Sequence, residues 1–448
     1  MKIIQHGDKG INKILGYKKV ESYEIYHTSN YLYSCINENH QYVKQNLTGK
    51  VVQLTEHEKK VLLIAAEEQI LGTEILDYNA EKLVEQYFLV PVMSNELQWY
   101  KMVRLVMKTL GHSGKGVKKY TILPTTGCNA KCVYCYEEGM VVRKMTPQVA
   151  EDVVEFIGRT RCDDEVKLVW FGGEPLTAKT IISQICRELT EKGVPFTSQI
   201  ITNAILMTPE LAKEAKEIWH LKKAQVSVDG ARSDYEARKQ YVNPKLHNYD
   251  AMLRAVHALL DEGIEVTLRV NYDGKNMDGM KEFLDEIRRE FDNSEKLFLY
   301  FGMLFQEQKK ETCVELYRKM YDLRRYLDET GMHYRKPPKE RFQFKVNYCM
   351  ADSLGDSVVI DPEGKLFHCE HLPGNDSFGS IYDEEFQFVP ESGTEEPDEQ
   401  CRNCPFLPEC TPFRKNRCPD WFPYCREFKE IDAEYFFEKL AARTETDE

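Results

Sequence analysis

The chain has 448 residues, of which 42% are apolar and 30% charged, a composition typical of a globular protein with two or three domains. Its net charge of -13 argues against a nucleic-acid partner, because a polyanion repels an acidic protein. No apolar run reaches the length of a membrane span, and residues 1–7 lack the apolar core of a signal peptide, so we expect a cytoplasmic protein with no membrane partner.

Residues 1–112 predict a small domain in which short strands are followed by helices. Strands rich in Tyr, Ile and Val are expected at 22–26, 31–36, 42–46 and 88–91. Thr55 and Glu58 have the spacing of a capping box that opens a helix to residue 68, and a second helix is expected at 80–86. This order indicates a winged-helix-like domain, followed by a polar linker at 108–119. The domain is either a structural cap or a peptide-binding module that adds a peptide strand to its sheet edge.

Residues 113–305 alternate strands with helices. The expected strands are 120–123, 167–171, 197–202, 224–228, 265–270 and 296–301. The expected helices are 147–160, 178–192, 209–219, 249–262 and 277–291. This alternation predicts an α/β fold with a parallel sheet, and six units fall short of eight, so we expect a partial (β/α)6 barrel. Ligands of such folds lie at the carboxyl ends of the strands.

The remaining chain predicts three further segments. Residues 306–345 form a bridging region with a charged helix at about 313–329. Residues 346–430 are rich in Cys, Pro and aromatic residues and weak in periodicity, so this domain needs metals to fold. Residues 431–448 form a C-terminal helix and an acidic tail.

Three closely spaced cysteines follow the first strand of the expected barrel. Cys128, Cys132 and Cys135 have CxxxCxxC spacing. A zinc knuckle is the alternative, although a structural zinc site needs four ligands and only three cysteines lie here. A [4Fe–4S] cluster has four irons with one thiolate each, so three cysteines suggest a cluster that leaves one iron open for a small molecule.

Three further motifs lie at the ends of later strands: WFGGEP at 170–175, ITNA at 201–204 and VSVDG at 226–230. With the three cysteines, they make residues 119–305 resemble the radical S-adenosylmethionine (SAM) superfamily. The resemblance implies that SAM binds the open iron through its amino and carboxylate groups. It also implies an enzyme in which a 5′-deoxyadenosyl radical abstracts hydrogen from a strong C–H bond.

The same resemblance implies a set of SAM contacts. Gly172 and Gly173 give room beside the methionyl end of SAM, and Glu174 faces its ammonium. Tyr134 is at the adenine-contacting position, and the polar residues suited to the ribose are Asn203, Ser227 and Asn271. Arg238 is expected to pair with the methionyl carboxylate, with Lys239 an equal alternative by spacing. The family often has Asn-Gly where this chain has Asn203-Ala204.

A second cysteine set in the C-terminal segment resembles the SPASM extension of radical SAM enzymes, which holds two auxiliary [4Fe–4S] clusters. The resemblance assigns the distal cluster, Auxiliary II, to Cys401, Cys404, Cys410 and Cys425. It leaves the nearer cluster, Auxiliary I, with Cys349, Cys369 and Cys418. One or two zinc sites are the alternative.

This set departs from the SPASM pattern. A cysteine often expected at the position of Arg414 is missing, and seven cysteines stand where two closed clusters need eight. Either His368 or His371 substitutes, or Auxiliary I has an open iron that binds a substrate thiolate. We prefer the open iron because it needs no compensating residue.

Together these features resemble maturases of ribosomally made peptides, of the sactipeptide and ranthipeptide thioether-forming type. The resemblance implies a precursor peptide held through its leader by the N-terminal domain, and an external flavodoxin- or ferredoxin-type electron donor. It also implies three [4Fe–4S] clusters in all. Carbon–carbon or carbon–oxygen crosslinking and formylglycine formation in a sulfatase are the enzyme alternatives. A non-catalytic electron carrier and a zinc-binding regulatory protein are the alternatives from other classes.

Overall fold

The structure is a computed structural model of the full chain. It describes all residues except 17, 37–40, 112–115, 163–164, 305–308, 336–343, 345, 347–354, 372–376, 389–396, 398, 411–424 and 447–448. Its contacts divide the chain into two compact units. Unit 1 contains Met1–His112, Lys336–Cys349 and Ser392–Glu448, and unit 2 contains Ser113–Arg335 and Met350–Glu391.

Unit 1 contains two antiparallel sheets. The four-stranded sheet has the order β1 (Lys2–Gln5), β5 (Lys50–Gln53), β4 (Gln41–Gln45) and β3 (Leu32–Ile36). The three-stranded sheet has the order β6 (Ile70–Leu71), β2 (Ile25–Thr28) and β7 (Leu89–Pro91). The strands predicted within residues 22–91 are confirmed to within a few residues, whereas β1, β5 and β6 were not predicted.

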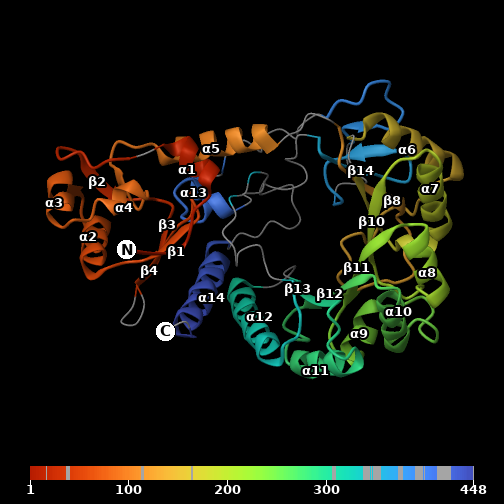
Figure 1. The fold of residues 1–448 in the computed structure, drawn as a ribbon. Helices are drawn as coiled ribbons and strands as arrows, with labels where there is room; N and C mark the ends of the chain where they lie inside the picture. Colours follow the sequence, from red (N-terminus) through yellow and green to blue (C-terminus); the bar gives the residue numbers. More distant parts are fainter. Residues whose placement is uncertain are drawn as a thin grey trace. The chain divides into compact units, whose positions relative to one another are not determined.

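Helices from both ends of the sequence belong to unit 1 (Figure 1). They are α1 (Lys9–Leu15), α2 (Glu56–Glu67), α3 (Gly72–Asp77), α4 (Lys82–Glu85), α5 (Glu96–Gly111), α13 (Glu399–Arg402) and α14 (Cys425–Thr446). The predicted capping box of α2 is confirmed, because Thr55 accepts from the amide of Glu58 and the Glu58 carboxylate accepts from the amide of Thr55. Residues 108–111, predicted to be linker, are the last turn of α5. The winged-helix assignment stays a prediction.

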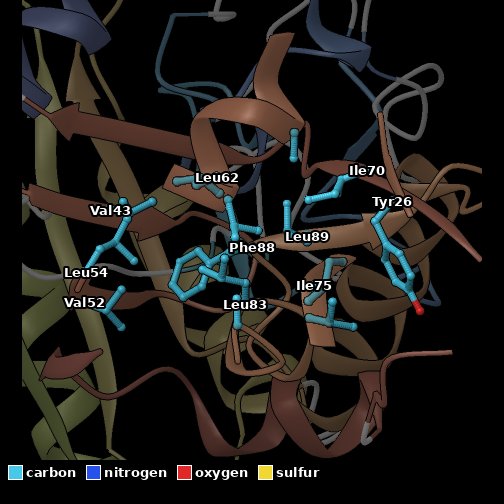
Figure 2. Packing of buried hydrophobic residues seen from close by; sticks show 14 residues of the cluster. Tyr26, Val43, Val52, Leu54, Leu62, Ile70, Ile75, Leu83, Phe88 and Leu89 are labelled. Carbon is cyan, nitrogen blue, oxygen red and sulfur yellow. The ribbon is translucent and has the colours of Figure 1, made fainter. Parts of the chain in front are cut away.

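An apolar core joins the two sheets of unit 1 to its helices. Val43 and Val52 from the first sheet pack with Leu62 of α2, Leu83 of α4 and Phe88 before β7 (Figure 2). All five side chains are buried, and burial of such side chains contributes roughly 1.5–3 kcal/mol each. The spacing of Val61, Leu62 and Ala65 on α2 gives one apolar face for this core.

Unit 2 is built on a nine-stranded sheet. Six parallel strands follow one another in chain order: β8 (Lys119–Thr125), β9 (Val166–Gly172), β10 (Phe196–Thr202), β11 (Leu221–Val228), β12 (Glu265–Tyr272) and β13 (Leu297–Met303). The six predicted strands of the α/β fold are confirmed. In β10, β11 and β12 the buried residues largely alternate with partly exposed or exposed ones, and such alternation in the sequence predicts a strand.

Helices follow the parallel strands of unit 2 (Figure 1). They are α6 (Pro147–Thr160), α7 (Lys179–Glu191) after the short η1 (Pro175–Ala178), α8 (Pro209–Glu217), α9 (Arg232–Lys239), α10 (Tyr249–Asp261), α11 (Met280–Glu290) and α12 (Lys310–Thr330). The predicted helices are confirmed, and α9 was not predicted. Among the residues with described placement, no helix has the length and apolar character that a membrane crossing requires.

Part of the predicted C-terminal domain extends the central sheet. Strand β14 (Ser357–Ile360) pairs parallel with β8, and β15 (Lys365–Phe367) and β16 (Gly379–Ser380) follow in antiparallel pairing. Residues from 392 onward instead belong to unit 1, where η4 (Leu407–Glu409) and α14 lie. The contacts therefore distribute residues 346–430 between the two units, and the predicted domain boundaries stay a prediction.

Candidate functional site

A loop directly after β8 is the centre of the candidate site, and we name residues 126–137 the cluster loop. On one side, the amide of Gly173 donates to the carbonyl of Thr125 (3.2 Å) and the amide of Glu174 donates to that of Gly127 (2.9 Å). On its other side, two backbone hydrogen bonds of 3.1 Å join it to the end of α9: Lys131 to Gln240 and Val133 to Arg238. The loop is thus fixed between the end of β9 and the end of α9.

Gly172 and Gly173 allow the end of β9 to approach this loop. A Cβ atom at Gly173 would lie 2.4 Å from the carbonyl oxygen of Gly127, and one at Gly172 would lie 2.2 Å from that of Thr125. Gly172 also has a φ of +116°, which disfavours other residues. The predicted place beside the methionyl end of SAM stays a prediction. In the structure, both positions require glycine because β9 packs closely on the cluster loop.

Glu174 joins the ends of β9 and β10. Its carboxylate accepts from the hydroxyl of Thr202 (2.5 Å) and from the amides of Asn203 (2.8 Å) and Leu176 (3.0 Å). The side chain is 1% exposed. Burial raises the pKa of Glu174, while these hydrogen bonds act in the opposite direction.

Asn203 connects β10 to the cluster loop. Its side-chain amide donates to Oδ1 of Asn129 (2.8 Å), and its Oδ1 accepts from the amide of Ile205 (3.1 Å). The following Ala204 has a φ of +60°. That conformation is the reason a glycine suits this position, and Ala204 adopts it at a cost of roughly 1–2 kcal/mol.

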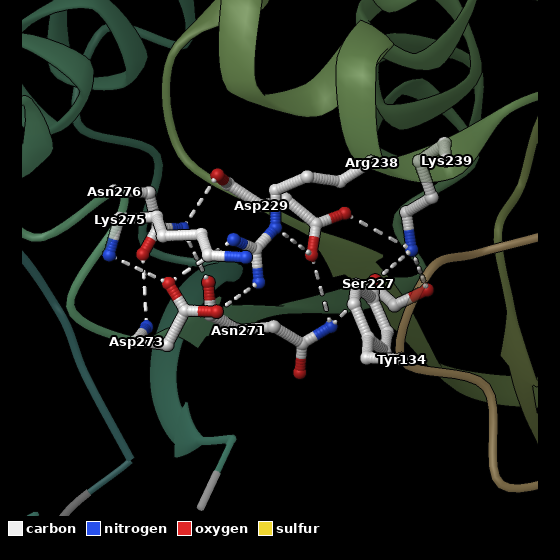
Figure 3. Close-up of polar contacts among 9 residues, drawn as sticks. All are labelled: Tyr134, Ser227, Asp229, Arg238, Lys239, Asn271, Asp273, Lys275 and Asn276. Atoms are coloured by element: carbon white, nitrogen blue, oxygen red, sulfur yellow. Dashed lines mark hydrogen bonds and ion pairs between the residues drawn. The ribbon is translucent and has the colours of Figure 1, made fainter. Parts of the chain in front are cut away.

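Four of the predicted contact residues meet in one polar network with Lys239 (Figure 3). The ammonium of Lys239 donates to the hydroxyl of Tyr134 (2.9 Å) and to that of Ser227 (3.0 Å), and it lies 3.4 Å from Oδ2 of Asp229. The side-chain amide of Asn271 donates to the same Tyr134 hydroxyl (3.1 Å). Burial by itself lowers the pKa of Lys239, but the Asp229 carboxylate together with Tyr134, Cys132 and Tyr241 holds the pKa well above the usual range.

Arg238, the other predicted cation, is paired with a different carboxylate. Its guanidinium donates to both oxygens of Asp273, at 3.1 and 2.8 Å, in bidentate geometry (Figure 3). Burial would raise the pKa of Asp273, but the hydrogen bonds from Arg238 hold it below its usual range. Arg238 therefore contacts the network from its far side, 3.9 Å from Oδ1 of Asp229. Its predicted role toward the methionyl carboxylate stays a prediction.

The sequence analysis missed three residues of this network. Asp229 stands between both cations, Asp273 pairs with Arg238, and the side chain of Asn276 donates to the carbonyls of Asp229 and Asn271 (both 2.9 Å). A signal for Asp229 was present, because it lies in the VSVDG motif directly after β11. No comparable signal marked Asp273 or Asn276, which follow β12 in a turn.

The thiols of Cys128, Cys132 and Cys135 all come from the cluster loop, and the amide of Cys135 donates to the carbonyl of Cys132 (3.0 Å). Within the residues that the structure describes, no three or more His, Cys, Asp and Glu side chains are arranged to hold a metal ion. The donor chemistry nevertheless fits an iron–sulfur cluster, since three thiols lie in one loop at a strand end. Burial raises the pKa of Cys132, and the Lys239 ammonium partly offsets this, so a bound metal would have to displace the thiol proton.

The second cysteine set is described in part. Cys349 and Cys418 lie outside the described residues, and so does the side chain of Cys425, which begins α14. Cys369 belongs to unit 2, and His371 nearby places its ring 4.6 Å from that of Tyr136 in the cluster loop. Cys401, Cys404 and Cys410 belong to unit 1 and are partly buried, whereas His368 of unit 2 is buried. Both auxiliary-cluster assignments stay predictions.

Comparison with known protein families identifies the central part of the chain. The family model described as the radical SAM superfamily matches residues 122–287. Residues 122–287 form a radical SAM domain. The prediction that the chain is an enzyme of the radical SAM type is confirmed.

Two curated relatives align with part of the chain. An uncharacterized protein of Methanocaldococcus jannaschii is 24% identical over 282 residues, which cover 60% of this chain and 90% of the relative. A Methanosarcina barkeri protein named Fe-coproporphyrin III synthase is 30% identical over 166 residues, covering 37% of this chain and 40% of the relative. This chain therefore spans less than half of the second relative.

Two solved structures share the fold over most of the chain. Native anSMEcpe with bound AdoMet and Cp18Cys peptide has a TM-score of 0.54 and 16% identity, covering 74% of this chain and 100% of that one. Streptococcus suis SuiB bound to precursor peptide SuiA has a TM-score of 0.51 and 12% identity, covering 86% of this chain and 94% of that one. The likeness to each is a likeness of fold.

Proposed function

We propose that the chain is a radical SAM maturase that installs thioether crosslinks, from a Cys sulfur to a carbon, in a ribosomally synthesised precursor peptide. The observation that carries the proposal is the extent of the fold likeness to SuiB bound to its precursor peptide, which covers 86% of this chain. That share exceeds the matched radical SAM domain, so the likeness includes segments outside residues 122–287. The second peptide-bound structure, anSMEcpe, supports a peptide substrate in the same way.

Unit 1 is the proposed site for the leader of the precursor peptide. Among the residues that the structure describes, β1 and β3 are the outer strands of its four-stranded sheet, and a peptide strand can be added at the edge of such a sheet. Tyr33 and Ser34 lie on β3, which pairs with β4 on its inner side. Leader binding at this sheet would bring the precursor to the enzyme independently of the residues that are modified.

The residues of the candidate site fit the binding of SAM and its cluster. The three thiols of the cluster loop would hold the iron–sulfur cluster, and the cluster together with SAM would supply the radical that removes a hydrogen atom from the acceptor carbon. Ser227 and Asn271 lie at the carboxyl ends of β11 and β12, where a ligand of this fold binds, and Tyr134 of the cluster loop joins them through the hydrogen bonds of its hydroxyl. The buried pair of Lys239 and Asp229 orients the hydroxyls of Tyr134 and Ser227, because Lys239 donates to both.

The reaction balances with SAM as the oxidant. One S–H bond of the substrate Cys and one C–H bond of the acceptor break, and one C–S bond forms. SAM is cleaved to methionine and 5′-deoxyadenosine, which takes up the hydrogen atom, and a proton is released. The electron that a flavodoxin- or ferredoxin-type donor supplies is returned when the C–S bond forms. Cys349, Cys369 and Cys418 give Auxiliary I three donors, which leaves a fourth position for the substrate thiolate.

The test is mass spectrometry of a Cys-containing precursor peptide incubated anaerobically with the purified protein, SAM and dithionite. We expect the loss of two hydrogens per crosslink, with that Cys no longer alkylated by iodoacetamide. A Cys128→Ala variant is the control, since it removes a cluster thiol and should give neither product nor 5′-deoxyadenosine. Unchanged peptide mass alongside 5′-deoxyadenosine formation would contradict the proposal.

The same experiment separates the alternative peptide chemistries. A carbon–carbon or carbon–oxygen crosslink also loses two hydrogens but leaves Cys open to alkylation. Formylglycine is an aldehyde and reacts with a hydrazide probe, which a thioether does not.

A tetrapyrrole substrate is the second candidate function. It is favoured by the 30% identity to the protein named Fe-coproporphyrin III synthase, although the alignment covers 37% of this chain. Titration with Fe-coproporphyrin III, followed by its absorbance, tests this candidate. Because the name of that relative makes Fe-coproporphyrin III its product, a saturable spectral shift on binding would support this candidate, and an unchanged spectrum would exclude it.

A further inference from the structure

The first sheet of unit 1 meets a cysteine-bearing loop that is more than 350 residues away in the sequence. We name residues 401–410 the cysteine loop. The loop is a series of tight turns closed by three backbone hydrogen bonds: Cys404 to Cys401 (3.1 Å), Leu407 to Cys404 (3.0 Å) and Cys410 to Leu407 (3.1 Å). Each of its three cysteines lies at an end of one of these turns, so the distances between the cysteines depend on the conformation of the turns.

Two polar side chains of the sheet hold the cysteine loop. Nζ of Lys44 on β4 lies 2.6 Å from Oε1 of Glu409, and both side chains are buried, at 6% and 8% exposure. The side-chain amide of Asn46, directly after β4, donates to the carbonyl of Pro405 (2.8 Å). Both contacts fall beside a ligand position, because Pro405 follows Cys404 and Glu409 precedes Cys410.

Apolar contacts support the same arrangement. The rings of Tyr33 on β3 and Phe406 lie 5.0 Å apart. Leu407 belongs to a buried cluster with Tyr31 and Tyr100, and Cys401 packs against that cluster. Phe406 and Leu407 thus anchor the middle of the cysteine loop on the sheet.

The buried ion pair is a costly way to gain stability. Removing two charges from water costs several kcal/mol each, and an apolar pair of the same size is often at least as stable. A charged pair does fix the relative position of two segments, because only one geometry satisfies both groups. The pair of Lys44 and Glu409 is therefore better suited to fixing the cysteine loop on the sheet than to stabilising the fold.

We propose that Lys44 and Asn46 are positioning residues that set the geometry of the cysteine loop as a metal site. The inference rests on the proposed function in one respect, which is that Cys401, Cys404 and Cys410 are ligands of an auxiliary [4Fe–4S] cluster. Because metal binding is coupled to folding of the loop that holds it, loading of this site and ordering of β4 stabilise each other. The sheet proposed to bind the leader is then most ordered when the metal site is full.

The test compares iron and sulfide content, and hydrogen exchange of residues 41–45 and 401–410, in the anaerobically reconstituted full chain. Wild type is expected to hold about twelve irons, as three cubane clusters require. Lys44→Met should lose about four of them and exchange at least tenfold faster in both segments. Lys44→Arg keeps the charge and should retain the iron. Lys192→Met is the matched control, because it breaks an exposed pair with Glu155 in unit 2 and should leave both readouts unchanged.

Other outcomes separate this inference from the proposed function. If Lys44→Met does not fold, as judged by circular dichroism, Asn46→Ala is read by the same assay with the same expectation. Wild-type iron content and exchange in the variant would overturn the inference, as would a wild type with only about four irons. Crosslinking is not measured here, so a fully loaded wild type that modifies no peptide would contradict the proposed function alone.

Discussion

Asp229 and Lys239 show how the candidate site keeps two opposite charges away from water. Their side chains are 0% and 2% exposed, and Nζ of Lys239 lies 3.4 Å from Oδ2 of Asp229. An isolated buried charge is strongly unfavourable, and the attraction between the two side chains offsets the cost of burying each charge. Lys239 also donates to Tyr134 and Ser227, which orients both hydroxyls.

Replacing Lys239 by Met should lower the free energy of unfolding of unit 2 by about 3–5 kcal/mol, because Asp229 would keep a buried charge without its nearest cation. The double variant Lys239→Met, Asp229→Asn removes both charges and should recover part of the loss. Urea unfolding followed by tryptophan fluorescence measures both, since Trp170 and Trp219 are buried in this unit.

Lys275→Met is the control for this substitution. Lys275 is an exposed lysine of the same region, and its replacement should change the free energy of unfolding by less than about 0.5 kcal/mol. Equal stability of Lys239→Met and wild type would show that Arg238 alone compensates Asp229.

At the scale of elements, two junctions between elements organise the molecule. The end of β9 packs on the cluster loop through Gly172 and Gly173, and the capping box of α2 closes the first turn of a helix whose buried face joins the core of unit 1. Both junctions were visible in the sequence as motifs. Only the structure shows which neighbouring backbone each motif meets.

Gly173→Ala should disrupt the cluster loop, because the added methyl group would lie 2.4 Å from the carbonyl oxygen of Gly127 and 2.6 Å from that of Thr126. Both neighbours are backbone atoms, so the strand and the loop must separate. We expect the variant to lose at least half of the iron that a Cys-to-Ala variant of the cluster loop loses. Iron analysis and electron paramagnetic resonance of the reduced protein measure this.

Gly158→Ala provides the comparison, since a Cβ atom there meets nothing within 4 Å and the residue lies on α6. It should load iron as wild type does. Full iron loading of Gly173→Ala would show that the loop tolerates displacement from β9.

Glu58→Gln should weaken α2 by about 1–2 kcal/mol, as loss of a charged capping contact does. The Glu58 carboxylate accepts from Thr55 and from the amino group of Met1 (3.0 Å). Burial would raise the pKa of Glu58, but these partners hold it below the usual 4.5. The stabilisation is therefore present above pH 4.5 and is lost as the pH falls through the lower pKa of the folded state.

Hydrogen exchange of Glu56–Glu67 measures this effect. Exchange should be about 5- to 30-fold faster in Glu58→Gln, and the ratio to wild type should stay constant between about pH 5.5 and 6.5, where the carboxylate is ionised in both states and amino groups are still charged. Glu67→Gln, an exposed residue at the end of the same helix, should not change the rate. A ratio that varies across this range would contradict the assigned pKa direction.

At the scale of the whole molecule, the sequence predicted what depends on neighbours along the chain. The six parallel strands were found because each is a short segment with regularly placed apolar residues between helical segments. Helix α9 (Arg232–Lys239) was missed because it is only eight residues long and most of them are polar. Asp273 and Asn276 were missed for a different reason: Asp273 pairs with Arg238 of α9, Asn276 donates to the carbonyls of Asp229 and Asn271, and no local pattern marks either residue.

The placement of the later cysteines depends on contacts that no local pattern encodes. Cys369 follows β15, a strand that extends the sheet of the radical SAM domain, and nearby His371 contacts Tyr136 of the cluster loop. The cysteine loop instead packs on β3 and β4 of unit 1. Spacing alone grouped these cysteines as one domain, whereas their contacts divide them between the unit that carries the cluster loop and the unit that carries the first sheet. If the cysteines act as proposed, Cys369 would act beside the cluster loop, and the cysteine loop would act beside the sheet proposed to bind the leader.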